Sequence, residues 1–189
     1  MISPTKVIVK VEKRYQDEID FNEGKLWKDT SYNPEWNVFP YGIVHSVPIR
    51  FPNDGLPYDI KVGDKLYMTY TVLMDDSNMI EHDGEEYWMV DMFSALAVAR
   101  DGKVIPLGQH ILIKKEEEEK ESEFIIIRDT HKTIKVNRGY VFASNDPEIP
   151  NGAYVTFEEV GMFENEIEGE TVYVMYNFNI LLKHEKENN

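Results

Sequence analysis

The side chains that could do chemistry in this sequence are five histidines and an abundance of carboxylates. No two of the histidines have the spacing of a zinc-binding pair on one helix, so a zinc site would need ligands that are distant in the sequence. The thirty-five Asp and Glu residues are too numerous for spacing alone to identify a catalytic pair. Nucleophile-elbow, phosphate-binding and dinucleotide motifs are absent. We therefore expect no enzymatic activity, no metal and no cofactor.

Two acidic clusters, residues 75–78 and 81–86, contain oxygen ligands that a cation could use. Neither has the ligand spacing of an EF-hand loop with its terminal Glu. We interpret them as solvated turns, with a hairpin tip as the favoured structure. The run of four glutamates at 116–119 is typical of a solvated tract whose like charges repel one another.

The composition limits the kinds of partner. With 20 Lys and Arg residues against 35 acidic ones, the 189-residue chain has a formal charge of −15. This charge argues against a nucleic-acid or anionic-membrane surface, because phosphate contacts require clustered Lys and Arg. The sequence contains no cysteine, which excludes disulfides, thiolate metal ligands and cysteine nucleophiles. The length allows one large domain or two small ones.

The N-terminal residues give no sign of secretion. Their longest apolar run, at residues 7–9, is too short for a signal peptide. No window contains the roughly 20 apolar residues that cross a bilayer as a helix. We expect a cytoplasmic protein that makes no membrane contact.

The elements that must position any functional residue are predicted to be β-strands. The apolar segments are short, rich in β-branched and aromatic residues, and mostly bounded by Gly, Pro, Asn or Asp. Residues 91–100 are either a strand or a short helical turn, because their apolar positions lack a helical period. The sequence therefore predicts an all-β fold, a sandwich or small barrels. The predicted strands cover residues 7–11, 41–47, 65–74, 111–113, 124–127, 140–143, 153–157 and 171–175.

The chain also contains an internal repeat, with matching segments in the same order in both halves. We expect two related domains, residues 1–100 and 101–189, joined around Asp101-Gly102. The alternative is that two unrelated all-β halves align by chance. The matched segments are 3–10 with 107–114, 42–46 with 139–143, 62–67 with 151–156, and 86–90 with 170–174.

Each half resembles the co-chaperonin family, with its GroES-like, chaperonin-10 fold. The first half has Pro4, a strand ending in Val9-Lys10, Gly42-Ile43-Val44, and a turn with the sequence Val62-Gly63-Asp64-Lys65. The second half has similar elements in the same order, but no Asp follows Gly152. The resemblance implies two small GroES-like β-barrels in tandem, without catalysis or a cofactor.

The resemblance also implies that a long loop after the first strand of a domain binds a large ATP-dependent chaperonin through an apolar tripeptide. In the second half this loop is residues 115–138, and Ile125, Ile126 and Ile127 occupy the place of the tripeptide. The alternative is that residues 124–127 form a buried strand.

The corresponding loop of the first half is longer, at residues 12–40. Its counterpart of the tripeptide is Leu26-Trp27, which is apolar but not an aliphatic triplet. Trp36 and Phe39 could instead pack this segment against the domain. A docking role for Leu26 and Trp27 is therefore the less favoured of the two possibilities.

The first functional hypothesis is thus a co-chaperonin-like protein that docks on a GroEL-like chaperonin, assists folding and is able to form a homo-oligomer. The second is a structural or adaptor protein, for instance a virus-encoded one, that uses the same barrel for protein–protein contacts. The third is a carbohydrate- or peptide-binding module whose aromatic residues gather on one face. Its candidate aromatics are Trp27, Trp36, Tyr41 and Tyr58.

Overall fold

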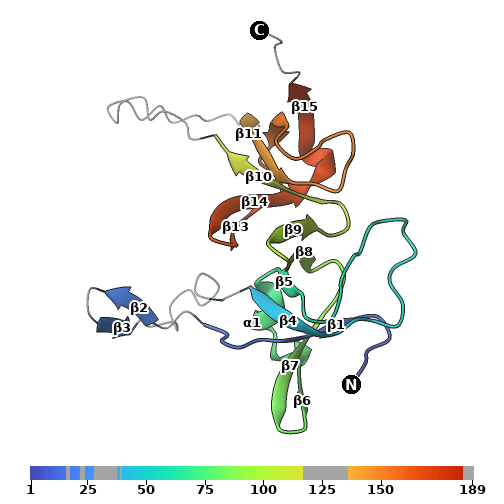
Figure 1. Cartoon of the computed structure of the whole chain (residues 1–189), viewed down its shortest axis with the longest axis vertical. Helices are drawn as coiled ribbons and strands as arrows, with labels where there is room; N and C mark the ends of the chain where they lie inside the picture. Colours follow the sequence, from blue (N-terminus) through green and yellow to red (C-terminus); the bar gives the residue numbers. More distant parts are fainter. Residues whose placement is uncertain (16–17, 22–23, 28–37, 39, 117–135, 185–189) are drawn as a thin grey trace, which may run out of the picture. The chain divides into compact units, whose positions relative to one another are not determined.

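The computed structural model describes residues 1–15, 18–21, 24–27, 38, 40–116 and 136–184. The chain divides into two compact units, Met1–Gly108 and Gln109–Asn189, each containing an antiparallel sheet (Figure 1). The predicted all-β class is confirmed. The division follows Gly108 and not Asp101-Gly102, because the strand after that dipeptide pairs with the first sheet.

The first unit contains a seven-stranded sheet in the order β6-β7-β1-β4-β5-β8-β9. A one-turn helix α1 (Thr71–Met74) and a 3-10 turn η2 (Asp76–Asn78) link β5 to β6, and a separate hairpin pairs β2 with β3. The strands are β1 (Val7–Lys10), β2 (Glu18–Phe21), β3 (Gly24–Trp27), β4 (Tyr41–Ser46), β5 (Lys65–Met68), β6 (Met79–His82), β7 (Glu85–Val90), β8 (Ala95–Arg100) and β9 (Lys103–Pro106).

The second unit contains a six-stranded sheet in the order β13-β14-β10-β11-β12-β15. A 3-10 turn η3 (Asn177–Asn179) links β14 to β15. The strands are β10 (His110–Lys115), β11 (Val136–Ala143), β12 (Tyr154–Glu158), β13 (Phe163–Ile167), β14 (Glu170–Tyr176) and β15 (Ile180–His184).

The two sheets have the same strand order when β6, β7, β1, β4, β5 and β8 are matched in turn with β13, β14, β10, β11, β12 and β15. Their irregularities match as well. The pairing shifts between Ile8 and Val9 in β1, and between Leu112 and Ile113 in β10. The hairpins β6–β7 and β13–β14 both turn through a non-glycine residue with positive φ followed by a glycine. Within the residues that the structure describes, β9, at the outer edge of β8, is the one strand of the first sheet without a counterpart in the second.

These registers correct one of the matches made from the sequence. Ile8 pairs with Met89 as Leu112 pairs with Val174, so Trp88 corresponds to Tyr173 and not to Val172. The sequence match between residues 86–90 and 170–174 is therefore wrong by one residue. Such a slip would exchange the two faces of the strand.

Each unit has its own apolar core, built from inward-facing residues of its strands. The first core includes Val7, Val9, Leu66 and Trp88, all nearly inaccessible to solvent. The second includes Ile111, Ile113, Val155, Phe157 and Met175. Burial of each such side chain contributes about 1.5–3 kcal/mol to the stability of the fold. Because the chain has no disulfides, the two cores must supply this stabilisation by burial.

Residues 91–100 form a turn followed by strand β8, so the expected strand begins only at Ala95. The acidic segment 81–86 lies on the β6–β7 hairpin, with Asp83 and Gly84 at its tip, as expected. In the described residues, no helix has the length and apolar character needed to span a membrane.

Candidate protein-docking surface

The long segment of the first unit lies between β1 and β4 and contains the β2–β3 hairpin. Both candidate docking residues of this segment are on β3: Leu26 pairs with Ile19 and Trp27 with Glu18. The Trp27 side chain is 77% exposed, although an indole ring is usually buried in a monomer. The hairpin thus presents a large aromatic side chain to solvent.

The base of this segment is fixed to the first unit. The Arg14 guanidinium lies 5.0 Å from the ring centroids of both Tyr15 and Trp88, and its Nη1 donates to Asp76 at 2.9 Å. Tyr15 also pairs with Val38, at the other end of the segment. A long insertion closed at its base costs less entropy to hold in place than one tethered only by its chain ends.

The corresponding segment of the second unit lies between β10 and β11. Its candidate docking residues Ile125, Ile126 and Ile127 lie outside the described residues, so the loop and strand alternatives both stay predictions. The base of the segment is described: Glu116 N donates to the Arg138 carbonyl at 2.9 Å. Two side-chain contacts hold the same end, Lys115 with Glu159 at 2.7 Å and Tyr154 with Glu116 at 2.6 Å.

Where each segment rejoins its sheet, a glycine allows two strands to approach closely. A Cβ atom on Gly139 would clash with the Lys114 carbonyl and lie 2.8 Å from Ile113 Cγ2. A Cβ on Gly42 would lie 3.0 Å from the Lys10 carbonyl oxygen. The Gly-x-Val pattern found in the sequence therefore reflects packing in both units, with the tighter approach in the second.

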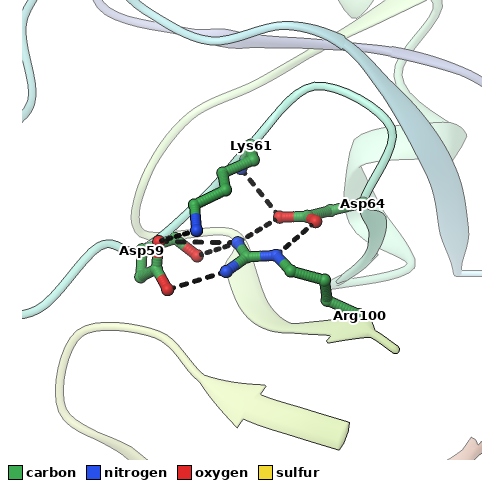
Figure 2. A network of polar contacts seen from close by, with 4 residues as sticks. All are labelled: Asp59, Lys61, Asp64 and Arg100. Carbon is green, nitrogen blue, oxygen red and sulfur yellow. Dashed lines mark hydrogen bonds and ion pairs between the residues drawn. The ribbon is translucent and has the colours of Figure 1, made fainter. Parts of the chain in front are cut away.

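The turn before β5 is held by a network of polar contacts (Figure 2). Arg100 Nε and Nη2 each donate to a carboxylate oxygen of Asp64 at 2.7 Å, and Nη1 donates to Asp59 at 2.8 Å. The Lys61 backbone N–H donates to Asp64 Oδ2 at 2.7 Å, which closes the turn onto the same carboxylate. The network joins the turn to β8.

The charges of this network support one another. Burial of Asp64 opposes its ionisation, but hydrogen bonds from Arg100 and the Lys61 backbone hold its pKa below the usual value. The hydrogen bond from Arg100 also lowers the pKa of Asp59. The two carboxylates raise the pKa of Arg100. All three groups are thus charged at neutral pH and act structurally.

The second unit forms the same turn without this network. Gly152 N donates to the Val141 carbonyl at 2.8 Å, as Gly63 N donates to Val44 at 2.9 Å. The position of Asp64 is occupied by Ala153, consistent with the missing Asp noted in the sequence. The carboxylate is therefore an addition to the turn and not a requirement for its backbone conformation.

The structure also shows a feature that the sequence analysis missed. Phe93 and Phe178 lie in the turns that precede β8 and β15, and their side chains are 79% and 68% exposed. An isolated exposed phenylalanine leaves no periodic signal in a sequence. Comparison of the two halves at the register given above would have aligned these two residues.

The aromatic residues considered for a carbohydrate or peptide site have different neighbours. The Lys65 ammonium lies 4.4 Å from the Tyr41 ring centroid, whereas Tyr58 stacks on Phe51 with centroids 6.1 Å apart. Burial and a hydrogen bond to Asp54 raise the pKa of Tyr58 to about 12. Trp36 lies outside the described residues. Among the described residues, no group of three or more His, Asp or Glu side chains is arranged to hold a metal ion.

Comparison with known families identifies the second half of the chain. Residues 103–184 match the family model Cpn10, described as the chaperonin 10 kDa subunit. The C-terminal half therefore carries a domain of this non-catalytic family, and the first unit is a second β-sheet domain that lies mostly outside the match. No curated protein matches the chain.

Proposed function

We propose that this protein is a co-chaperonin-like protein that docks on a large ATP-dependent chaperonin and has no catalytic activity of its own. The observation that carries the proposal is the match of residues 103–184 to the chaperonin 10 kDa subunit. Nucleotide hydrolysis belongs to the partner in this proposal, so the chain needs no cofactor. Docking is assigned to the two long segments expected from the sequence, residues 12–40 and 115–138, although the structure places Lys115 in β10 and residues 136–138 in β11.

The docking residues in the proposal are Ile125, Ile126 and Ile127 in the second segment, with Leu26 and Trp27 in the first. Burial of one such side chain returns about 1.5–3 kcal/mol. Ordering the loop costs about 1–2 kcal/mol per residue, so a single segment binds weakly. Two segments in one chain raise the effective concentration of the second contact once the first has formed. The exposed Trp27 side chain supports a contribution from the first segment.

We also infer that the two units arose by duplication of one domain. Their common strand order, matching register shifts and similar hairpin turns support this inference. An ion pair supports it as well: Lys10 with Glu85 at 2.7 Å corresponds to Lys114 with Glu170 at 2.8 Å. In this view β9 belongs to the second domain by descent, although it pairs with the first sheet.

We also propose that the chain assembles into a homo-oligomer, because the outer edges of the two sheets differ. On β8, Leu96 and Ala97 are buried, and β9 pairs along that edge. Their counterparts on β15, Leu181 and Leu182, are 45% and 59% exposed, and within the described residues no strand pairs with the outer edge of β15. We propose that an extended N-terminal segment of a second copy pairs there, a head-to-tail contact that can close into a ring.

Titration of the chain with a purified GroEL-type chaperonin in the presence of ADP tests the docking proposal. We expect saturable binding that weakens sharply when Ile125, Ile126 and Ile127 are all changed to Ser. A wild-type chain that does not bind, or that binds equally well without the three isoleucines, would contradict docking through this segment. The adaptor hypothesis would then lead.

A further inference from the structure

Phe93 and Phe178 occupy equivalent positions in the two units. Five residues separate Met89 from Ala95, and five separate Val174 from Ile180, and these flanking residues are equivalent by strand pairing. The phenylalanines therefore correspond without a gap. The two halves are otherwise dissimilar in these turns, which have the sequences DMFS and YNFN over residues 91–94 and 176–179.

Other residues shared by the two units have evident structural roles. Gly42 and Gly139 permit close strand approach, Val44 and Val141 are buried, and Lys10 and Lys114 form equivalent ion pairs. The phenylalanines have no such explanation, because most of each ring is exposed to water. A single exposed apolar side chain is common on a protein surface, but the same exposed ring at equivalent positions of two units is an observation that a shared contact with another molecule would explain.

The two turns hold their rings in defined positions. Asp91 Oδ1 accepts hydrogen bonds from the backbone N–H groups of Phe93 and Ser94, both at 3.0 Å. In the second unit the Phe178 ring stacks on Tyr176 with centroids 5.1 Å apart, and Asn177 N donates to the Gln109 carbonyl at 2.8 Å. A side chain presented on an ordered turn loses little conformational freedom on binding.

Both turns lie next to the strand end where the long segment rejoins its unit. In the first unit, Thr69 N donates to the Ser94 carbonyl and Met68 N donates to Pro40, the last residue of the segment, both at 2.9 Å. In the second, Asn179 Nδ2 donates to the Val160 carbonyl, just beyond Glu158, which pairs with Val136 at the start of β11. A partner that binds a long segment is thereby brought to the adjacent phenylalanine.

We propose that Phe93 and Phe178 form two equivalent apolar contacts with the same ring-shaped chaperonin that the long segments bind. Each phenyl group enters an apolar hollow on one subunit of that chaperonin. The inference rests on the proposed function and adds a rigid contact beside each docking segment. Two equivalent contacts on tandem units fit a partner with repeated, identical sites, namely a homo-oligomeric chaperonin ring.

The test is a binding titration with purified GroEL-type chaperonin and ADP, using full-length chains. The variants are Phe93→Ser, Phe178→Ser and the double variant, with Ile49→Ser as the matched control because that side chain is 69% exposed and outside the two turns. We expect each single variant to weaken binding about tenfold and the double variant further, since burial of one aromatic ring accounts for a factor of this size. Ile49→Ser should bind as wild type, and all variants should retain the wild-type circular dichroism spectrum and melting temperature.

The outcomes separate the two proposals. If the wild type binds, the triple isoleucine variant does not, and both phenylalanine variants bind as wild type, the phenylalanine contact is refuted while loop docking stands. If the wild type does not bind the chaperonin at all, both proposals are refuted. Weakening by Phe93→Ser or Phe178→Ser equal to that of Ile49→Ser also refutes the contact, because it would reflect a general loss of apolar surface.

Discussion

Arg100 and Asp64 are thirty-six residues apart in the chain, yet two guanidinium nitrogens of Arg100 each donate to a carboxylate oxygen of Asp64 at 2.7 Å. The Asp64 side chain is only 3% exposed, so its carboxylate depends on these protein donors in place of water. The pair joins the turn before β5 to β8, the strand whose outer edge carries β9.

Replacing Asp64 by Ala should therefore destabilise the first unit. We expect the free energy of unfolding to fall by about 1–3 kcal/mol, because the change removes the buried acceptor of two Arg100 N–H groups and of the Lys61 backbone N–H, while Arg100 keeps its contact with Asp59. Urea denaturation followed by the fluorescence of Trp88, which is buried in the first core, measures the effect. Lys10→Ala, which breaks a half-exposed ion pair, is the control and should have a much smaller effect. Equal effects of the two variants would argue against a special role for the Arg100–Asp64 contact.

The same network predicts how stability depends on pH. Arg100 lowers the pKa of Asp59, and the pKa of Asp64 is lowered despite its burial. A carboxyl group with a lower pKa in the folded state stabilises the fold above its unfolded pKa of about 4, and this stabilisation is lost as the pH falls through the folded value. Below about pH 4, the melting temperature of the wild type should therefore decrease more steeply with falling pH than the melting temperature of Asp64→Asn. Parallel curves for the two proteins would contradict the assignment.

The two close-approach glycines should respond differently to an added methyl group. Gly139→Ala forces a clash with the Lys114 carbonyl and Ile113, and should destabilise the second unit by about 1–3 kcal/mol. Gly42→Ala is the matched control, because its nearest contacts are 3.0–3.1 Å away and small shifts relieve them. Thermal denaturation of both variants measures the difference. A larger effect at Gly42 would contradict the observed packing.

Trp27 allows the docking role of the first segment to be tested on its own. Its ring is 77% exposed, so Trp27→Ser should change the stability by no more than about 0.5 kcal/mol. If the first segment contributes to docking, binding to a GroEL-type chaperonin with ADP should weaken several-fold, and Trp27→Phe should restore most of the affinity. Unchanged binding by Trp27→Ser would confine docking to the second segment.

The edge of β15 predicts how assembly can be blocked. Leu182→Lys places a charge where a strand of a second copy is proposed to pair, and edge lysines oppose such pairing. Light scattering after size exclusion should show a smaller particle than for the wild type. Val62→Lys, at a residue of the first unit that is 66% exposed, should leave the mass unchanged. A wild-type protein that is monomeric at high concentration would contradict the proposed assembly.

Much of the strand content could be predicted from the sequence, because short β-branched runs bounded by turn residues are a local signal. The equivalence of Gly42 with Gly139 and of Gly63 with Gly152 could also be predicted, because each glycine belongs to a short local motif that recurs in the same order in both halves. The match around β7 was wrong by one residue because Glu86 and Glu170 are identical, whereas the pairing of Trp88 and Tyr173 with the neighbouring strands sets the true register.

The remaining features depend on contacts between distant parts of the chain. The pairing of Arg100 with Asp64 has no sequence signal, since the two residues meet only when β5 and β8 pair. The position of β9 in the first sheet was missed because a strand-like segment does not specify which edge it joins. Phe93 and Phe178 could be recognised as a pair only from the exposure of their side chains together with the equivalence of their positions in the two units.

Hydrogen exchange across residues 115–138, in the free protein and after mixing with a GroEL-type chaperonin and nucleotide, tests the central proposal most directly. Between β10 and β11 we expect fast exchange in the free protein and protection of Ile125, Ile126 and Ile127 in the mixture. Slow exchange in the free protein that the chaperonin does not change would show that these isoleucines belong to an ordinary strand. That result would contradict docking through this segment.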